Sequence, residues 1–326
     1  MKNRYYKQMV SVLLFFILCP LVNWAQQLSL YETVSIKTGT GLNDIGNQLG
    51  GKKEQPYSDP FKGFAVTSRG EILIQDVVNM RVQRFSRHGT ILKPLIMPDL
   101  FWPGEICVSE NDEIFVSDDR IERVITFSSD GTVVRTFNPG YRYFKLLYRS
   151  VPILSLKCYK NKLTLVYGID RVLDNKIMPI YEDIYDLNFS LLHRKEYSDD
   201  RAYYSSLLDK MPNMILAFVD NRGYHYYYTI SQGHTGRENR LGINRDQALL
   251  KYSPSGDLVF KIDSEWLSRN MKYHVGAVPG SELTELKGNN LSIFNWYVTH
   301  NGNLYILLAN NDLVKVFRII EGDDRK

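Results

Sequence analysis

The chain has 326 residues, of which 44% are hydrophobic and 23% are charged, and this is the composition of a globular protein rather than a disordered one. Its 40 basic and 36 acidic residues give a net charge of +4, and loss of the basic residues of the leader described next, Lys2, Arg4 and Lys7, lowers it to +1. A near-neutral chain without a basic stripe argues against nucleic acid as a partner.

Residues 1–25 follow the pattern of a secretory signal peptide. The basic start is followed by an apolar segment, 10–18, and Pro20 ends this segment. The segment is shorter than the roughly 20 residues that a membrane-spanning helix needs. Ala25 offers a small residue before a cleavage site. The sequence therefore predicts an exported protein whose mature domain, 26–326, has no transmembrane segment.

Cys19 leaves lipidation as an alternative to simple cleavage. A lipobox has a small residue before its cysteine, whereas here Leu18 precedes Cys19 and Pro20 follows it. We therefore expect cleavage after Ala25, without a lipid, and a mature chain that starts at Gln26.

A set of four residue types recurs 42 positions further along the chain. Asp76, Arg81, Phe85 and Gly89 return as Asp118, Arg123, Phe127 and Gly131. A fixed period of about 40–45 residues that holds several short strands is the signature of a propeller blade. The sequence therefore predicts an all-β fold, a single β-propeller of four-stranded antiparallel blades.

Five such units can be recognised in chain order. They cover 61–96, 103–137, 153–195, 214–262 and 291–319. The last unit lacks a fourth strand, and the segment 28–37 can supply it by pairing with 313–319. Closure of the ring in this way removes the exposed sheet edges that would otherwise template aggregation. The aromatic run 224–228 lies in one of the predicted strands, so we expect it in the core.

The first of these units carries a family resemblance. Its motif D-x-x-N-x-R-V-x-x-F resembles a blade of the NHL repeat, and consists here of Asp76, Asn79, Arg81, Val82 and Phe85, followed by Gly89. The whole chain resembles the exported six-bladed propellers of Bacteroides-type bacteria. This resemblance implies a place in the periplasm or on the outer surface of a Gram-negative cell. It also implies six blades, so either a sixth blade lies within 263–290 or the ring has five.

Asp76 and Arg81 belong to a motif that repeats, and a repeated motif is more often scaffold than binding site. We expect the two side chains to pair inside their blade. Cys107 and Cys158 remain in the mature chain, and an exported chain can pair its cysteines. Both are predicted on innermost strands of neighbouring blades, whose backbones we expect to lie too far apart for a disulfide. We therefore expect two free, buried thiols.

The connections between the predicted strands differ in length on the two faces of the ring. Short turns join the first strand of a blade to the second and the third to the fourth. The other connections are mostly long and lie at 38–60, 138–150, 168–179, 196–213, 231–247 and 263–290. Loops longer than about 12 residues are uncommon unless functional or disordered. We therefore predict a ligand site on this long-loop face, with aromatic and Arg anchors drawn from Trp102, Tyr143, Tyr204, Arg240 and Trp266.

The sequence contains no H-E-x-x-H, G-x-S-x-G or Walker motif. The favoured function is a non-enzymatic binding or scaffold propeller of the bacterial envelope, without a cofactor, whose partner is a glycan, a peptide or an envelope protein. The alternative is a metal-dependent hydrolase or lyase with a divalent metal in the axial channel. His234 and His274, on the long-loop face, are the histidine pair considered for that metal.

Overall fold

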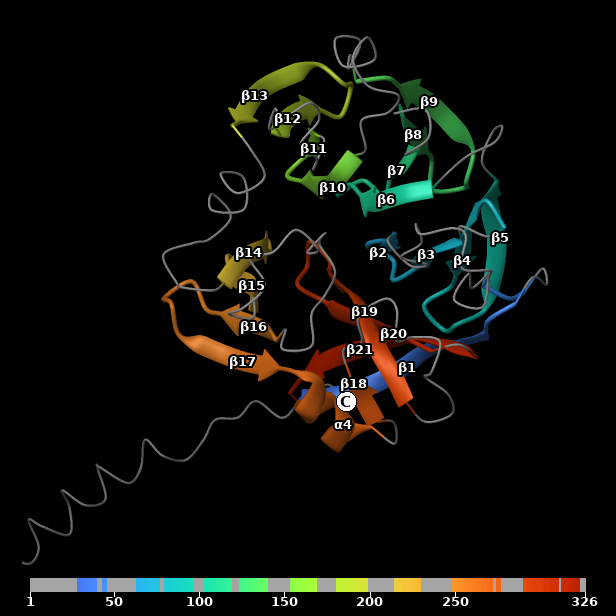
Figure 1. Cartoon of the computed structure of the whole chain (residues 1–326), viewed down its shortest axis with the longest axis vertical. Coiled ribbons are helices and arrows are strands. Elements are labelled where there is room, and N and C mark those ends of the chain that lie inside the picture. The colour runs from blue at the N-terminus through green and yellow to red at the C-terminus, as the bar shows by residue number, and fades with distance from the viewer. Residues whose placement is uncertain are drawn as a thin grey trace, which may run out of the picture.

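The computed structural model describes residues 28–39, 43–45, 63–76, 79–96, 103–118, 123–139, 153–168, 180–198, 214–229, 248–271, 274–276, 290–310 and 312–322. These residues form five β-sheets that stand around a common axis as the blades of a propeller (Figure 1). The prediction of an all-β fold in one ring is confirmed.

Blades one to three follow the chain in order, and each is an antiparallel sheet of four strands. Blade one consists of β2 (Phe64–Val66), β3 (Ile72–Asp76), β4 (Arg81–Phe85) and β5 (Ile91–Ile96). Blade two consists of β6 (Pro103–Val108), β7 (Ile114–Asp118), β8 (Arg123–Phe127) and β9 (Val133–Phe137). Blade three consists of β10 (Ile153–Tyr159), β11 (Lys162–Gly168), β12 (Ile180–Asp186) and β13 (Leu191–Tyr197).

Blade four has the same order, and blade five is completed from elsewhere in the chain. Blade four consists of β14 (Met214–Val219), β15 (His225–Thr229), β16 (Leu249–Tyr252) and β17 (Leu258–Ile262). Blade five consists of β19 (Asn290–Val298), β20 (Leu304–Ala309), β21 (Leu313–Glu321) and, as its outermost strand, β1 (Leu28–Lys37). A short strand, β18 (His274–Gly276), runs parallel to β19.

The described part of the chain has five blades, so the sixth blade implied by the resemblance is absent from it. The segment in which a sixth blade would lie begins with the helix α4 (Ser264–Asn270) and continues with β18, which joins blade five. Asp263 caps the helix, since its carboxylate accepts a hydrogen bond of 2.8 Å from the backbone N–H of Trp266.

Adjacent blades pack face to face and share the hydrophobic core. Successive side chains of a strand point to opposite faces of its sheet. In β3, Ile72 and Ile74 therefore pack in a cluster with strands of blade five, whereas Leu73 packs in a cluster with strands of blade two. All three side chains are fully buried. A blade sandwiched on both sides explains why β3 is hydrophobic at consecutive positions.

The ring is closed by the N-terminal strand, as the sequence predicts. β1 pairs with β21 in antiparallel register from Leu28 opposite Glu321 to Lys37 opposite Leu313. The Thr33 hydroxyl donates a hydrogen bond of 2.9 Å to the Val316 carbonyl. Blade one packs tightly against this strand. Gly89, whose φ is +80°, lies so close to the Thr33 carbonyl that any side chain at this position would collide with it.

The repeated Asp and Arg form an internal pair in blades one and two. The Arg81 Nε atom lies 2.9 Å from the Asp76 carboxylate, and the Arg123 Nε atom lies 3.0 Å from that of Asp118. Asp76 is fully buried and also accepts hydrogen bonds from the side chain of Asn79, at 3.0 and 2.8 Å. The prediction of a pair within the blade is confirmed.

Replacement of Arg81 by Ala is expected to lower the free energy of unfolding by about 3 kcal/mol, since it leaves a buried carboxylate without its counter-charge. Urea denaturation measures this loss. Arg69→Ala is the matched control, because Arg69 pairs with Asp112 at 3.4 Å but is 60% exposed, and an exposed pair contributes less than about 1 kcal/mol. Equal stability of the two variants would contradict a scaffold role for Arg81.

Cys107 and Cys158 form a disulfide, so the expectation of two free thiols is wrong. Their Cα atoms lie 5.7 Å apart, within the usual range for a disulfide. The bond joins β6 of blade two to β10 of blade three. The innermost strands of neighbouring blades converge on the axis, and β6 and β10 contact each other directly. This convergence brings the two thiols within bonding distance.

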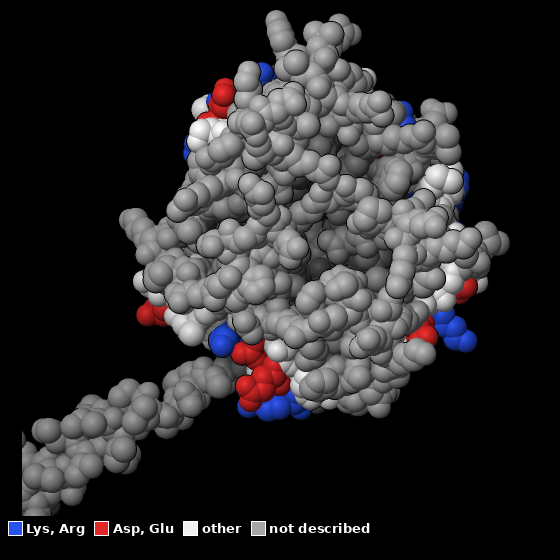
Figure 2. Space-filling view, in the orientation of Figure 1, with Lys and Arg blue, Asp and Glu red and all other residues white. Residues whose placement is uncertain are grey.

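On the face seen in Figure 2, the charged residues that can be made out lie at the rim. In the view down the axis, Lys, Arg, Asp and Glu side chains appear at the edge of the disc (Figure 2). No helix within the described ranges has both the length and the apolar character to cross a membrane.

Candidate functional site

The described residues form a pocket at one end of the propeller axis. It lies at the turns that join the first and second strands of four blades. These turns share one geometry, in which the fourth residue has a positive φ: Gly70 at +79°, Asp112 at +61°, Gly223 at +82° and Gly302 at +77°. Glycine adopts this conformation without strain. The shared geometry presents the two middle residues of each turn at the end of the blade.

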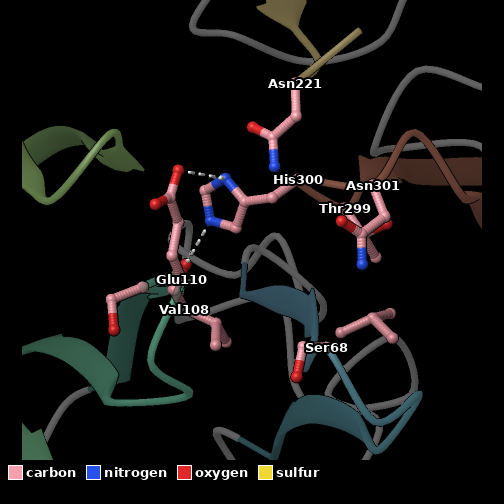
Figure 3. Close-up of a pocket in the computed structure, with 9 residues that line it drawn as sticks. Ser68, Val108, Glu110, Asn221, Thr299, His300 and Asn301 are labelled. Atoms are coloured by element: carbon pink, nitrogen blue, oxygen red, sulfur yellow. Dashed lines mark hydrogen bonds and ion pairs between the residues drawn. The ribbon is translucent and has the colours of Figure 1, made fainter.

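The pocket is small, with a volume of about 100 Å³, and its lining is more apolar than polar (Figure 3). It is lined by Val66, Ser68, Val108, Ser109, Glu110, Asn221, Thr299, His300 and Asn301. A pocket of this size has room for a small chemical group of a larger ligand. Blades one, two, four and five all contribute to it.

Contacts between turns of different blades hold this end of the ring together. The Ser68 backbone N–H and hydroxyl both donate to the Asp112 carboxylate, each at 2.7 Å, and so join blade one to blade two. The Asn221 N–H donates to the His300 carbonyl at 3.0 Å and joins blade four to blade five. The lining is therefore fixed before any ligand binds, as in most ligand sites.

His300 reaches across the axis. Its Nε2 atom lies 3.2 Å from the Val108 carbonyl oxygen of blade two, although blades two and five are not neighbours in the ring. Because a carbonyl only accepts, Nε2 carries the proton, and Nδ1 of the neutral ring is an acceptor. Nδ1 is buried, has no hydrogen-bond partner, and lies 3.9 Å from Glu110 Oε1, with which it makes a longer electrostatic contact (Figure 3).

Three carboxylates of the described residues lie on the turns around the pocket, those of Glu110, Asp112 and Asp220, and the two aspartates each form an ion pair with an arginine. Asp112 pairs with Arg69 at 3.4 Å in addition to its bonds from Ser68. Asp220 pairs with Arg222 at 3.3 Å.

Asp220 also accepts hydrogen bonds from within its own blade. Two of its donors are the Tyr224 N–H at 3.0 Å and the Tyr226 hydroxyl at 3.2 Å. Burial raises the pKa of Tyr226, so its hydroxyl stays protonated and donates. Tyr226 and Tyr227 are both buried, which confirms that the aromatic run at 224–228 contributes to the core.

Glu110 carries the third of these carboxylates, and no arginine of the described residues pairs with it. Its side chain is 32% exposed, and among the described residues its one ion-pair contact is the 3.9 Å approach to His300. The carboxamides of Asn221 and Asn301, both exposed, line the same pocket. The pocket thus offers a net negative charge together with amide donors and acceptors.

The structure tests little of the ligand set predicted from the sequence. Trp102, Tyr143, Tyr204 and Arg240 lie outside the described residues, so they remain predictions. Trp266 lies on α4, is partly buried, and packs against the hydrophobic cluster of blades four and five. The described pocket lies on the opposite face, at the short turns.

The prediction from the sequence missed this pocket because it followed loop length, which led to the other face. One sequence signal marks its site. The middle positions of all four turns carry polar pairs, Ser68-Arg69, Glu110-Asn111, Asn221-Arg222 and His300-Asn301. Of the histidines considered for a metal, His274 begins β18 and His234 lies outside the described residues. Within the described ranges, no three His, Cys, Asp or Glu side chains are grouped so as to hold a metal ion.

Comparison with known proteins gives structural similarities at low identity. No protein-family model and no curated protein matches the chain. A member of the DUF4221 family from Bacteroides vulgatus is 11% identical, with a TM-score of 0.41, over 91% of this chain and 100% of that one. A virginiamycin B lyase from Staphylococcus aureus is 14% identical, with a TM-score of 0.35, over 90% and 100% of the two chains. A streptogramin B lyase is 9% identical, with a TM-score of 0.32, over 82% and 67%.

Proposed function

We propose that the protein is an exported, non-enzymatic binding propeller of the bacterial envelope, and that its ligand is a glycan or a peptide. The observation that carries this proposal is the axial pocket. The side chains of Glu110, Asn221, His300 and Asn301 reach it from three different blades, and hydrogen bonds between turns hold the lining in place. Such a preformed pocket, with a few polar groups in a rigid scaffold, suits recognition of one group of a larger ligand.

Export is supported by two independent features. The leader at 1–25 has the pattern of a signal peptide. The Cys107–Cys158 disulfide is the kind of bond that forms and persists outside the reducing cytosol. Together they favour a place of action in the periplasm or on the cell surface.

Two faces of the ring remain available to a ligand. The long-loop face, with Trp102 and Tyr204, is the prediction from the sequence. The tight-turn face holds the described pocket. A ligand that binds at either face satisfies the proposed function, so the test must separate the two.

The test is a binding screen with the mature chain against immobilised bacterial glycans and peptides. The double variant Asn221→Ala, Asn301→Ala is expected to bind the selected ligand at least tenfold more weakly, because it removes two carboxamides from the pocket. Its melting temperature should be unchanged, since both side chains are exposed. Asn111→Ala, an exposed Asn in a neighbouring turn that does not line the pocket, is the matched control.

A second pair of changes, Trp102→Ala with Tyr204→Ala, tests the long-loop face. If this pair alone abolishes binding, the protein is still a binding propeller and its site is on that face. Absence of any ligand, together with a stoichiometric divalent metal and hydrolase or lyase activity in the purified protein, would instead favour the metal-dependent alternative.

A further inference from the structure

The carboxylates near the axial pocket differ in whether an arginine pairs with them. Among the described residues, the turns that line it carry three carboxylates, Glu110, Asp112 and Asp220, and two guanidinium groups, Arg69 and Arg222. Each guanidinium pairs with one of the buried aspartates, at 3.4 and 3.3 Å. The carboxylate of this set without a guanidinium partner is that of Glu110.

Among the described residues, Glu110 has no hydrogen bond to its carboxylate. Its one ion-pair contact there is with His300, whose Nδ1 atom lies 3.9 Å from Glu110 Oε1, too far for a hydrogen bond. The ring proton is held on the other nitrogen by the Val108 carbonyl. Two acceptors thus face each other, and a group that carries both positive charge and several N–H donors is the natural complement.

We propose that the pocket binds the side-chain ammonium group of a lysine on a peptide or protein ligand, with Glu110 as its counter-charge. The carboxamide oxygens of Asn221 and Asn301 accept its remaining N–H bonds. An ammonium group is a compact charge with three donors and no acceptor. This assignment rests on the proposed binding function and narrows its ligand to a peptide.

The pocket can take the end of a lysine side chain. Its volume is about 100 Å³, and the end of this side chain is a methylene and an ammonium on a narrow stem. The amine of an amino sugar is attached directly to a pyranose ring, so glucosamine is the comparison that the test has to include.

The direct test is calorimetric titration of the mature protein with N-acetyl-lysine methylamide. Glu110→Gln is expected to raise the dissociation constant at least tenfold, since it removes the counter-charge and keeps the shape. Glu265→Gln removes a carboxylate that is 78% exposed on α4, remote from the pocket lining, and should change nothing. The same probe acetylated on its side-chain nitrogen should not bind. Melting temperatures of both variants confirm that they fold.

Equal affinity of wild type and Glu110→Gln for the lysine probe, or tighter binding of glucosamine than of this probe, would overturn the proposal. A peptide or glycan from the screen whose binding ignores Glu110→Gln would overturn it too, and would leave the binding function intact.

Discussion

A chain that lacks residues 28–37 is expected to melt far below the complete mature protein and to aggregate on heating. The deletion removes the outermost strand of blade five and with it the ladder to β21. It also removes Val34 and Ile36, which are 2% and 7% exposed, and a fully buried aliphatic side chain contributes roughly 1.5–3 kcal/mol. Together with the lost ladder, the cost approaches the 5–15 kcal/mol that stabilises a typical domain.

Differential scanning calorimetry measures this effect, and single substitutions within the strand provide a matched comparison. Val34→Asp should destabilise strongly, because it places a charge in the core. Tyr31→Asp lies on the same strand at a position that is 57% exposed, and should have little effect. A melting temperature unchanged by the deletion would show that β1 does not close the ring.

Loss of the Cys107–Cys158 disulfide is expected to lower the free energy of unfolding by about 4 kcal/mol. The bond closes a loop with a sequence separation of 51 residues, and the chain-entropy model gives about that value for such a loop. In a domain of this size the melting temperature should fall by roughly 8 °C. The measurement is a thermal scan with and without a thiol reductant.

The double variant Cys107→Ala, Cys158→Ala serves as the control for reduction. It should melt at the lower temperature in both conditions, because it has no bond to reduce. Two titratable thiols in the unfolded, unreduced wild-type protein would show that the bond does not form.

The blades could be predicted from the sequence because their signals are local. Asp76 and Arg81 recur at a fixed spacing, and each pair lies on adjacent strands of one blade, so the repeat maps directly onto the sheet. The N-terminal closing strand could be found by counting, because the last unit lacked a partner for β21. Both conclusions depend only on the pattern of strands along the chain, and neither requires knowledge of the distances between blades.

The disulfide and the pocket could not be predicted in the same way. The distance between Cys107 and Cys158 depends on how closely β6 and β10 converge at the axis, which is a property of the assembled ring. The approach of His300 to Val108 likewise joins blades that are neighbours neither in sequence nor in the ring. The helix α4 was missed as well, because the segment 263–290 was expected to be a long connection or to hold a sixth blade.

The pairing of β1 with β21 also has a kinetic consequence. Thr33 and Val316, which a hydrogen bond joins, are 283 positions apart. β1 must therefore wait for β21 to be synthesised, and loop-closure entropy makes such distant pairings slow. Until the two strands meet, β21 presents an unpaired edge that can recruit another chain. The pairing of β1 with β21 is therefore expected to be a late step in folding, and the step most exposed to aggregation.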